Sequence, residues 1–175
     1  MRAKSGQPAV IEVQRPEGVC LTALVARAED LFDMALQPEA SPGWLWRAPR
    51  FVRLVIQTTN GGPSSALYDE LLRRPFKLGL FMSQRRVPVV MQWPDQKATF
   101  VPVFADTQSV DRAAHELAID PTSQVAGMYG RELLTWALEG GLGVALGAFA
   151  EEGVRYVRIE PSTIVELLRR FEQRH

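Results

Sequence analysis

Two kinds of hydrophobic spacing alternate along this chain, and their order constrains the fold more than any other feature of the sequence. Runs rich in β-branched and aromatic residues predict strands, whereas apolar residues spaced three and four apart predict amphipathic helices. We expect strands at 9–13, 51–57, 76–82, 87–93, 98–104, 125–129, 142–147 and 154–160. We expect helices at 21–36, 65–74, 109–119, 130–140 and 161–173. This mixture predicts an α+β or α/β fold, a single compact domain in which helices pack on a mixed β-sheet.

Loop-forming residues divide the chain near residue 60. The stretch TTNGGPSS at 58–65 is the best candidate boundary inside the sequence, because Gly, Pro, Asn and Ser favour turns. We expect residues 1–60 to form an N-terminal β-α-β extension that packs on the main α+β domain, residues 61–175. Pro88 and Pro102 fall inside strand-like runs. Because proline cannot donate a ladder hydrogen bond, each predicts an edge, a strand end or a bulge.

The stretch EGGLGVALG, Glu139 to Gly147, has glycines spaced like those of a nucleotide-binding loop. A dinucleotide fingerprint needs a strand, a glycine loop and a helix in that order, with the spacing G-x-G-x-x-G. Here a helix comes first, a strand follows, and the spacing is G-x-G-x-x-x-G. We therefore expect no phosphate site. Gly140 or Gly141 is predicted to end the helix with a positive φ, and Gly143 to let the strand approach its neighbour closely.

Charge and composition argue against several classes of function. The 175 residues carry 20 basic and 20 acidic side chains, so the basic excess that is typical of nucleic-acid binding is missing. No apolar run reaches the ~20 residues that span a bilayer. The basic N-terminus is not followed by an apolar segment of the secretory type. We expect a cytoplasmic protein that binds neither membranes nor nucleic acid.

The sequence contains no catalytic or metal-binding pattern. It has no G-x-S-x-G, and its two histidines are His115, inside a predicted helix, and His175, the last residue. Catalysis by histidine needs a nucleophile and an orienting carboxylate within hydrogen-bond reach. A zinc site needs His and Cys ligands in close spacing, and Cys20 is the single cysteine. We expect no catalytic residues, no metal and no cofactor, and we favour a non-enzymatic protein over an enzyme.

A segment rich in tryptophan and arginine, SPGWLWRAPRF, is the candidate partner-binding surface. Trp44 and Trp46 would share one face of an extended segment. Arg47, Arg50 and Phe51 flank them, and Trp and Arg are enriched at interface hot spots. The alternative is that the tryptophans cover the core beside a sheet edge. On the first interpretation we expect a protein partner, with a homodimer as one of its forms.

Short motifs follow one another in the second half of the chain. They are VPVFAD at 101–106, GRELL at 130–134, the apolar strand after the glycines, and PSTI at 161–164. Over about residues 67–173 this order resembles the N-terminal domain of the bacterial enhanced-serine-sensitivity (SseB) family. The resemblance implies a compact α+β domain and no settled activity. Together with the Trp/Arg segment and the missing catalytic pattern, it leads us to expect a non-enzymatic interaction or regulatory module.

Two other functions stay open. One is a small-ligand-binding or weakly enzymatic domain, with a ligand loop formed by Phe104, Asp106, Gly130 and Arg131. The other is a secretion-system accessory or chaperone-like protein, which the small size and the α+β pattern allow.

Overall fold

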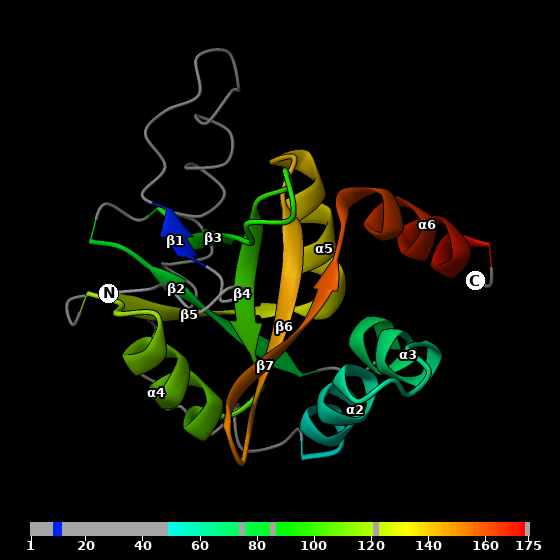
Figure 1. Ribbon diagram of the computed structural model, residues 1–175. Coiled ribbons are helices and arrows are strands. Elements are labelled where there is room, and N and C mark those ends of the chain that lie inside the picture. Colours follow the sequence, from blue (N-terminus) through cyan, green and yellow to red (C-terminus); the bar gives the residue numbers. More distant parts are fainter. Residues whose placement is uncertain (1–8, 12–48, 74–75, 85–86, 121–122, 174–175) are drawn as a thin grey trace.

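The computed structural model describes residues 9–11, 49–73, 76–84, 87–120 and 123–173 (Figure 1). In this part of the chain, five helices pack on a seven-stranded mixed sheet, which confirms the α+β fold. The helices are α2 (Pro49–Thr59), α3 (Ser65–Arg73), α4 (Thr107–Glu116), α5 (Gly130–Glu139) and α6 (Pro161–Glu172). The strands are β1 (Ala9–Ile11), β2 (Lys77–Met82), β3 (Val90–Gln92), β4 (Phe100–Phe104), β5 (Gln124–Tyr129), β6 (Gly143–Ala150) and β7 (Gly153–Ile159).

β4 lies at the centre of the sheet. It pairs in parallel with β6 on one side, and antiparallel with β2 and β3 on the other. β5 pairs with β2, β7 pairs with β6, and β1 pairs with β3, all antiparallel. Among the described strands, β5 and β7 therefore stand at the two ends of the order β5-β2-β4-β6-β7.

The helices α4 and α5 cross between parallel strands and lie on opposite faces of the sheet. The chain passes from β4 through α4 to β5, and returns from β5 through α5 to β6 in the opposite direction. Such crossovers are almost always right-handed, so opposite directions place the two helices on opposite faces. α5 shares its face with α2, α3 and α6, while α4 covers the other (Figure 1).

Each face of the sheet has its own core. Under α2, α3, α5 and α6 the core is mostly aliphatic, and its helical residues include Phe51, Val55, Leu67, Leu71, Leu133, Leu134, Ile164 and Leu167. The face near α4 carries a set of rings, the aromatic cluster, formed by Phe81, Trp93, Phe100, Phe104 and Tyr156. The rings meet edge to face, the geometry that aromatic pairs prefer.

The glycine stretch performs the structural roles that its order predicts. Gly141 has a φ of 67°, and its N–H donates to the carbonyl oxygen of Leu138, while the N–H of Leu142 donates to that of Ala137. These two bonds are the Schellman ending of an α-helix. A Cβ added to Gly143 would lie 2.5 Å from the ring of Phe100, so the predicted close approach of this strand is confirmed.

The prediction of a strand at 51–57 is wrong, because these residues lie within α2. Phe51 and Val55, four residues apart, are buried, whereas Arg53 and Gln57 are exposed, which is helical periodicity. The β-branched composition of this run is therefore overridden by burial of one helical face. The helix predicted at 21–36 lies outside the described residues.

The described parts of the first sixty residues join the same sheet and core as the rest. β1 pairs with β3, and Phe51 and Val55 of α2 belong to the aliphatic core. Pro102 also differs from expectation, since it lies within the central strand. It stands between Phe100, which pairs with β3, and Val103, which pairs with β2. The antiparallel ladder changes partner at this point, which explains how the strand accommodates a residue without an N–H.

Candidate functional site

The predicted partner-binding surface is described only in part. Trp44, Trp46 and Arg47 lie outside the described residues. Arg50 is exposed on α2, and its Nε lies 3.8 Å from a carboxylate oxygen of Glu70. Phe51 is only 1% exposed and packs edge to face on Phe76 with ring centroids 5.1 Å apart. Phe51 is therefore a core residue, and its place in an exposed surface is corrected.

Asp106, predicted in a ligand loop, caps the first turn of α4. One of its carboxylate oxygens accepts a hydrogen bond from the Ser109 N–H at 2.8 Å, and the other from the Ser109 hydroxyl at 2.6 Å. The fully buried Ser109 hydroxyl in turn accepts from the Phe149 N–H at 2.8 Å. This cap link, Asp106–Ser109–Phe149, joins the end of β4, the start of α4 and the end of β6. Both oxygens of Asp106 thus have a structural role.

The other predicted ligand-loop residues do not converge on Asp106. Phe104 is fully buried in the aromatic cluster. Gly130 allows α5 to approach α3, because an added Cβ would collide with the carbonyl oxygen of Leu71. Arg131 is exposed, and its guanidinium lies over the Phe171 ring of α6, 5.1 Å from the centroid. Asp106 starts the helix on one face of the sheet, whereas Arg131 contacts a helix on the other. The predicted loop is therefore not one site.

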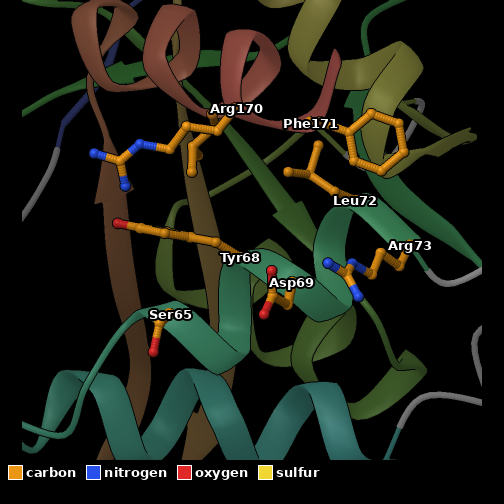
Figure 2. Close-up of a pocket in the computed structure, with 8 residues that line it drawn as sticks. Ser65, Tyr68, Asp69, Leu72, Arg73, Arg170 and Phe171 are labelled. Carbon is orange, nitrogen blue, oxygen red and sulfur yellow. The ribbon is translucent and has the colours of Figure 1, made fainter. Parts of the chain in front are cut away.

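A small open groove lies between α3 and α6, with a volume of about 130 Å³. Figure 2 shows Tyr68 and Arg170 pointing toward one another across it, while Leu72 and Phe171 lie together on the opposite side. Arg73 and Asp69 also line it. The groove thus combines an apolar wall with two guanidinium groups, one carboxylate and the Tyr68 hydroxyl, and the excess of positive charge can hold a small organic anion. Phe171 connects it to Arg131, the one predicted ligand-loop residue near this groove.

Among the ionisable groups of the described residues, the Tyr156 hydroxyl is the one whose pKa is most strongly affected by its surroundings. It is buried in the aromatic cluster, where no described residue forms a hydrogen bond with it. Burial raises the pKa of this hydroxyl far above its ordinary range, and the negative charge of Glu116 raises it further. A phenol with a raised pKa stays protonated at neutral pH. Tyr156 is therefore not prepared to act as a base.

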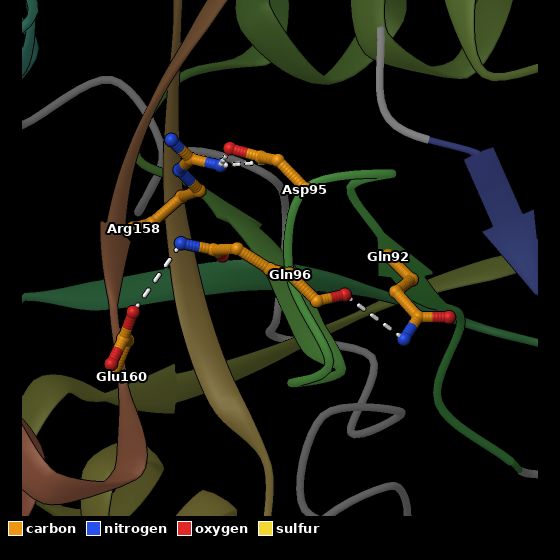
Figure 3. Close-up of polar contacts among 5 residues, drawn as sticks. All are labelled: Gln92, Asp95, Gln96, Arg158 and Glu160. Carbon is orange, nitrogen blue, oxygen red and sulfur yellow. Dashed lines mark hydrogen bonds and ion pairs between the residues drawn. The ribbon is translucent and has the colours of Figure 1, made fainter. Parts of the chain in front are cut away.

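Polar contacts fasten the turn after β3 to β7 and the start of α6 (Figure 3). Arg158 lies 3.3 Å from a carboxylate oxygen of Asp95 and stacks over the Trp93 ring at 5.2 Å. The Gln96 amide donates to Glu160 at 3.3 Å. These are exposed contacts, and exposed ion pairs contribute little stability. These contacts hold the turn after β3 against β7 and the start of α6.

Sequence reasoning missed the outer edge of β5. Val125 is 36% exposed and Tyr129 40%, and they belong to the three exposed large hydrophobic side chains of the described residues. Lys77 of β2 lies over the Tyr129 ring, 5.5 Å from its centroid. The uncharged composition of QVAGMY was visible in the sequence. Its position at the edge was not, because the order of strands comes from the topology.

Among the described residues, no three His, Cys, Asp or Glu side chains lie close enough together to hold a metal ion. No helix within the described ranges has the length and apolar character needed to cross a membrane. Comparisons of the chain with models of protein families, with curated proteins and with solved structures found no match.

Proposed function

We propose that this chain is a non-enzymatic interaction module of the bacterial SseB N-terminal-domain type, acting in the cytoplasm, and that it binds another polypeptide through β5. The observation that carries the proposal is an uncharged strand at the end of the sheet with two exposed apolar side chains, Val125 and Tyr129. Proteins usually protect such edges with charge, proline or a covering element. A partner polypeptide can pack on these two side chains, which lie near the two ends of the strand, while Ala126, Gly127 and Met128 between them are buried.

The other end of the described sheet supports this interpretation by contrast. β7 carries Arg155 and Arg158, whose guanidinium groups bind Asn60 and Asp95. Charged side chains of this kind discourage the addition of a further strand. From Gln124 to Tyr129, β5 contains neither a charged residue nor a proline. The two ends of the described sheet thus differ in charge, and the end formed by β5 offers a partner apolar side chains.

A photoreactive amino acid placed at position 125 tests the proposal, with the same probe at position 165 as the control. Val125 and Val165 are 36% and 37% exposed, so the two probes have equal access to solvent on different elements. We expect crosslinks to a polypeptide from position 125 in cells, and far fewer from position 165. Equal yields at the two positions would contradict binding through β5.

The groove between α3 and α6 favours a second candidate function, the binding of a small organic anion. Arg170 of α6 offers its guanidinium and Tyr68 of α3 its hydroxyl, facing each other across the same end of the groove (Figure 2). The Arg170 side chain is 70% exposed and pairs with Glu166 at 3.6 Å, a weak surface contact that an incoming anion can replace. Leu72 and Phe171 would contact the apolar part of the ligand.

Thermal denaturation with added phosphate or a short-chain carboxylate tests the groove, with sodium chloride at equal ionic strength as reference. A ligand at one hundred times its Kd stabilises the folded state by about 2.7 kcal/mol. Arg170→Gln should abolish this effect, while Arg169→Gln should preserve it, because Arg169 is exposed and does not line the groove. No stabilisation beyond that of sodium chloride would remove this candidate.

A further inference from the structure

The groove between α3 and α6 separates its polar groups from its apolar ones. At one end the Tyr68 hydroxyl and the Arg170 guanidinium face each other, and at the other Leu72 and Phe171 lie together (Figure 2). A ligand that satisfies both ends carries a charged group on a hydrocarbon body. The planar fork of a guanidinium matches a carboxylate, and a tyrosine hydroxyl can donate a further hydrogen bond to it.

The charges that line the groove limit the charge of the ligand. Arg73 and Arg170 are cationic and Asp69 is anionic, which leaves one positive charge in excess. A monocarboxylate carries one negative charge and neutralises this excess. A phosphate monoester carries about −1.5 to −2 at neutral pH, and its additional charge would be repelled by the Asp69 carboxylate. The lining therefore favours a monocarboxylate over a phosphate.

The apolar end favours an aromatic ring. Tyr68 and Phe171 are both partly buried, and aromatic pairs gain stability beyond the area that they bury. The Arg131 guanidinium lies over the Phe171 ring, 5.1 Å from its centroid, a contact that holds the ring in position. The groove volume of about 130 Å³ equals the share of about four water molecules in the liquid, so it accommodates a single ring.

From the separation of polar and apolar groups, the single excess charge and the small volume, we infer that this groove binds a small aromatic monocarboxylate. The carboxylate lies between Arg170 and Tyr68, and the ring packs against Leu72 and Phe171. The inference rests on the second candidate function, the binding of a small organic anion, and names the class of that anion.

NMR titration of the purified full-length chain measures the affinities that test the inference. Benzoate is the probe, and each comparison compound lacks one of its features: acetate has no ring, benzyl alcohol no charge, and phenyl phosphate has a larger charge. We expect benzoate to bind at least several-fold more tightly than each of the other three. Acetate, benzyl alcohol or phenyl phosphate binding as tightly as benzoate would overturn the inference.

The same titration locates the ligand. The ring current of bound benzoate should shift the methyl resonances of Leu72, which lines the groove. The methyl resonances of Leu117 should stay unchanged, because Leu117 packs on the aromatic cluster at the other face of the sheet. Shifts at Leu117 without shifts at Leu72 would place the ligand elsewhere and overturn the inference.

Replacing Phe171 with leucine tests the contribution of the ring contact, with Phe149→Leu as the matched control. Both phenylalanines are partly buried, and each lies under a guanidinium, that of Arg112 lying 4.9 Å from the Phe149 centroid. Phe171→Leu should weaken benzoate binding about two- to tenfold and leave acetate binding unchanged. Phe149→Leu should change neither affinity. Circular dichroism and the Tm establish that both variants are folded, and equal effects on benzoate would contradict a ring contact in the groove.

Replacing Asp69 with asparagine tests the limit on charge. Both anions should bind more tightly, and the gain for phenyl phosphate should be about twice that for benzoate on a logarithmic scale, because its charge is about twice as large. Asp111→Asn, at an exposed position of α4, should change neither affinity. No preferential gain for phenyl phosphate in Asp69→Asn would refute the charge argument.

These outcomes separate the inference from the function on which it rests. If acetate, phenyl phosphate and benzoate bind equally well, and Arg170→Gln abolishes the binding of all three, the groove binds anions but the inferred class is wrong. If none of the three binds, both the class and the anion-binding function are wrong. Crosslinking from position 125 tests binding through β5 independently of either result.

Discussion

Replacing Ser109 with alanine should destabilise the protein more than any other single hydroxyl removal in the described helices. Ser109 is fully buried, donates to Asp106 at 2.6 Å and accepts from the Phe149 N–H at 2.8 Å. A hydrogen bond to a charged group contributes about 1.5–3 kcal/mol, and a buried donor left without a partner costs about 1 kcal/mol or more. We therefore expect Ser109→Ala to lower the free energy of unfolding by about 2–4 kcal/mol.

Urea denaturation followed by circular dichroism measures this change. In a chain of this size 1 kcal/mol corresponds to about 2–4 °C, so the Tm should fall by roughly 5–15 °C. Ser162→Ala is the matched control, because Ser162 is exposed in the first turn of α6, and its loss should cost less than about 0.5 kcal/mol. Equal losses in the two variants would refute the structural role of the cap link.

Two further predictions concern Gly130 and Tyr156. Gly130→Ala should cost about 3 kcal/mol or more in urea denaturation, because the new Cβ would collide with the carbonyl oxygen of Leu71, and an unchanged midpoint would show that α3 and α5 do not pack this closely. The folded state raises the pKa of Tyr156, so the associated stability is fully present below the ordinary tyrosine pKa of about 10 and is lost as pH rises above it. In Tm measurements from pH about 8 to about 11, the wild type should therefore lose stability more steeply than Tyr156→Phe, and parallel curves would contradict the burial of this hydroxyl.

The sequence predicts most of the fold because its periodic segments also satisfy local rules. The segment that becomes α5 is one example, since its helical spacing is followed by Gly141, which adopts the positive φ expected of a helix end. The sequence analysis did not predict α2. It interpreted residues 51–57 as a strand because of their β-branched side chains, although the apolar residues Phe51 and Val55 have helical spacing. The end of α2 carried a usable signal, as Gly61 has a φ of 90° and Gly62 donates to the Gln57 carbonyl oxygen. This is the same Schellman ending as in α5.

The candidate site was harder to predict than the fold. Asp106 and Arg131 follow β4 and β5, two strands that run in the same direction. The right-handed crossovers place their helices on opposite faces, which no local pattern reveals. The exposure of Val125 and Tyr129 likewise depends on which strand ends the sheet. Such features arise from long-range pairing, so a short motif does not encode them.

The cap link also has a consequence for the order of events during synthesis. Ser109 and Phe149 are forty residues apart in sequence, and the Ser109 hydroxyl joins the first turn of α4 to an N–H at the far end of β6. Translation adds about 5–20 residues per second, so α4 leaves the ribosome seconds before its partner. During that interval Asp106 can cap the helix, but the link to β6 cannot form. α4 therefore reaches its final stability only after β6 has been made.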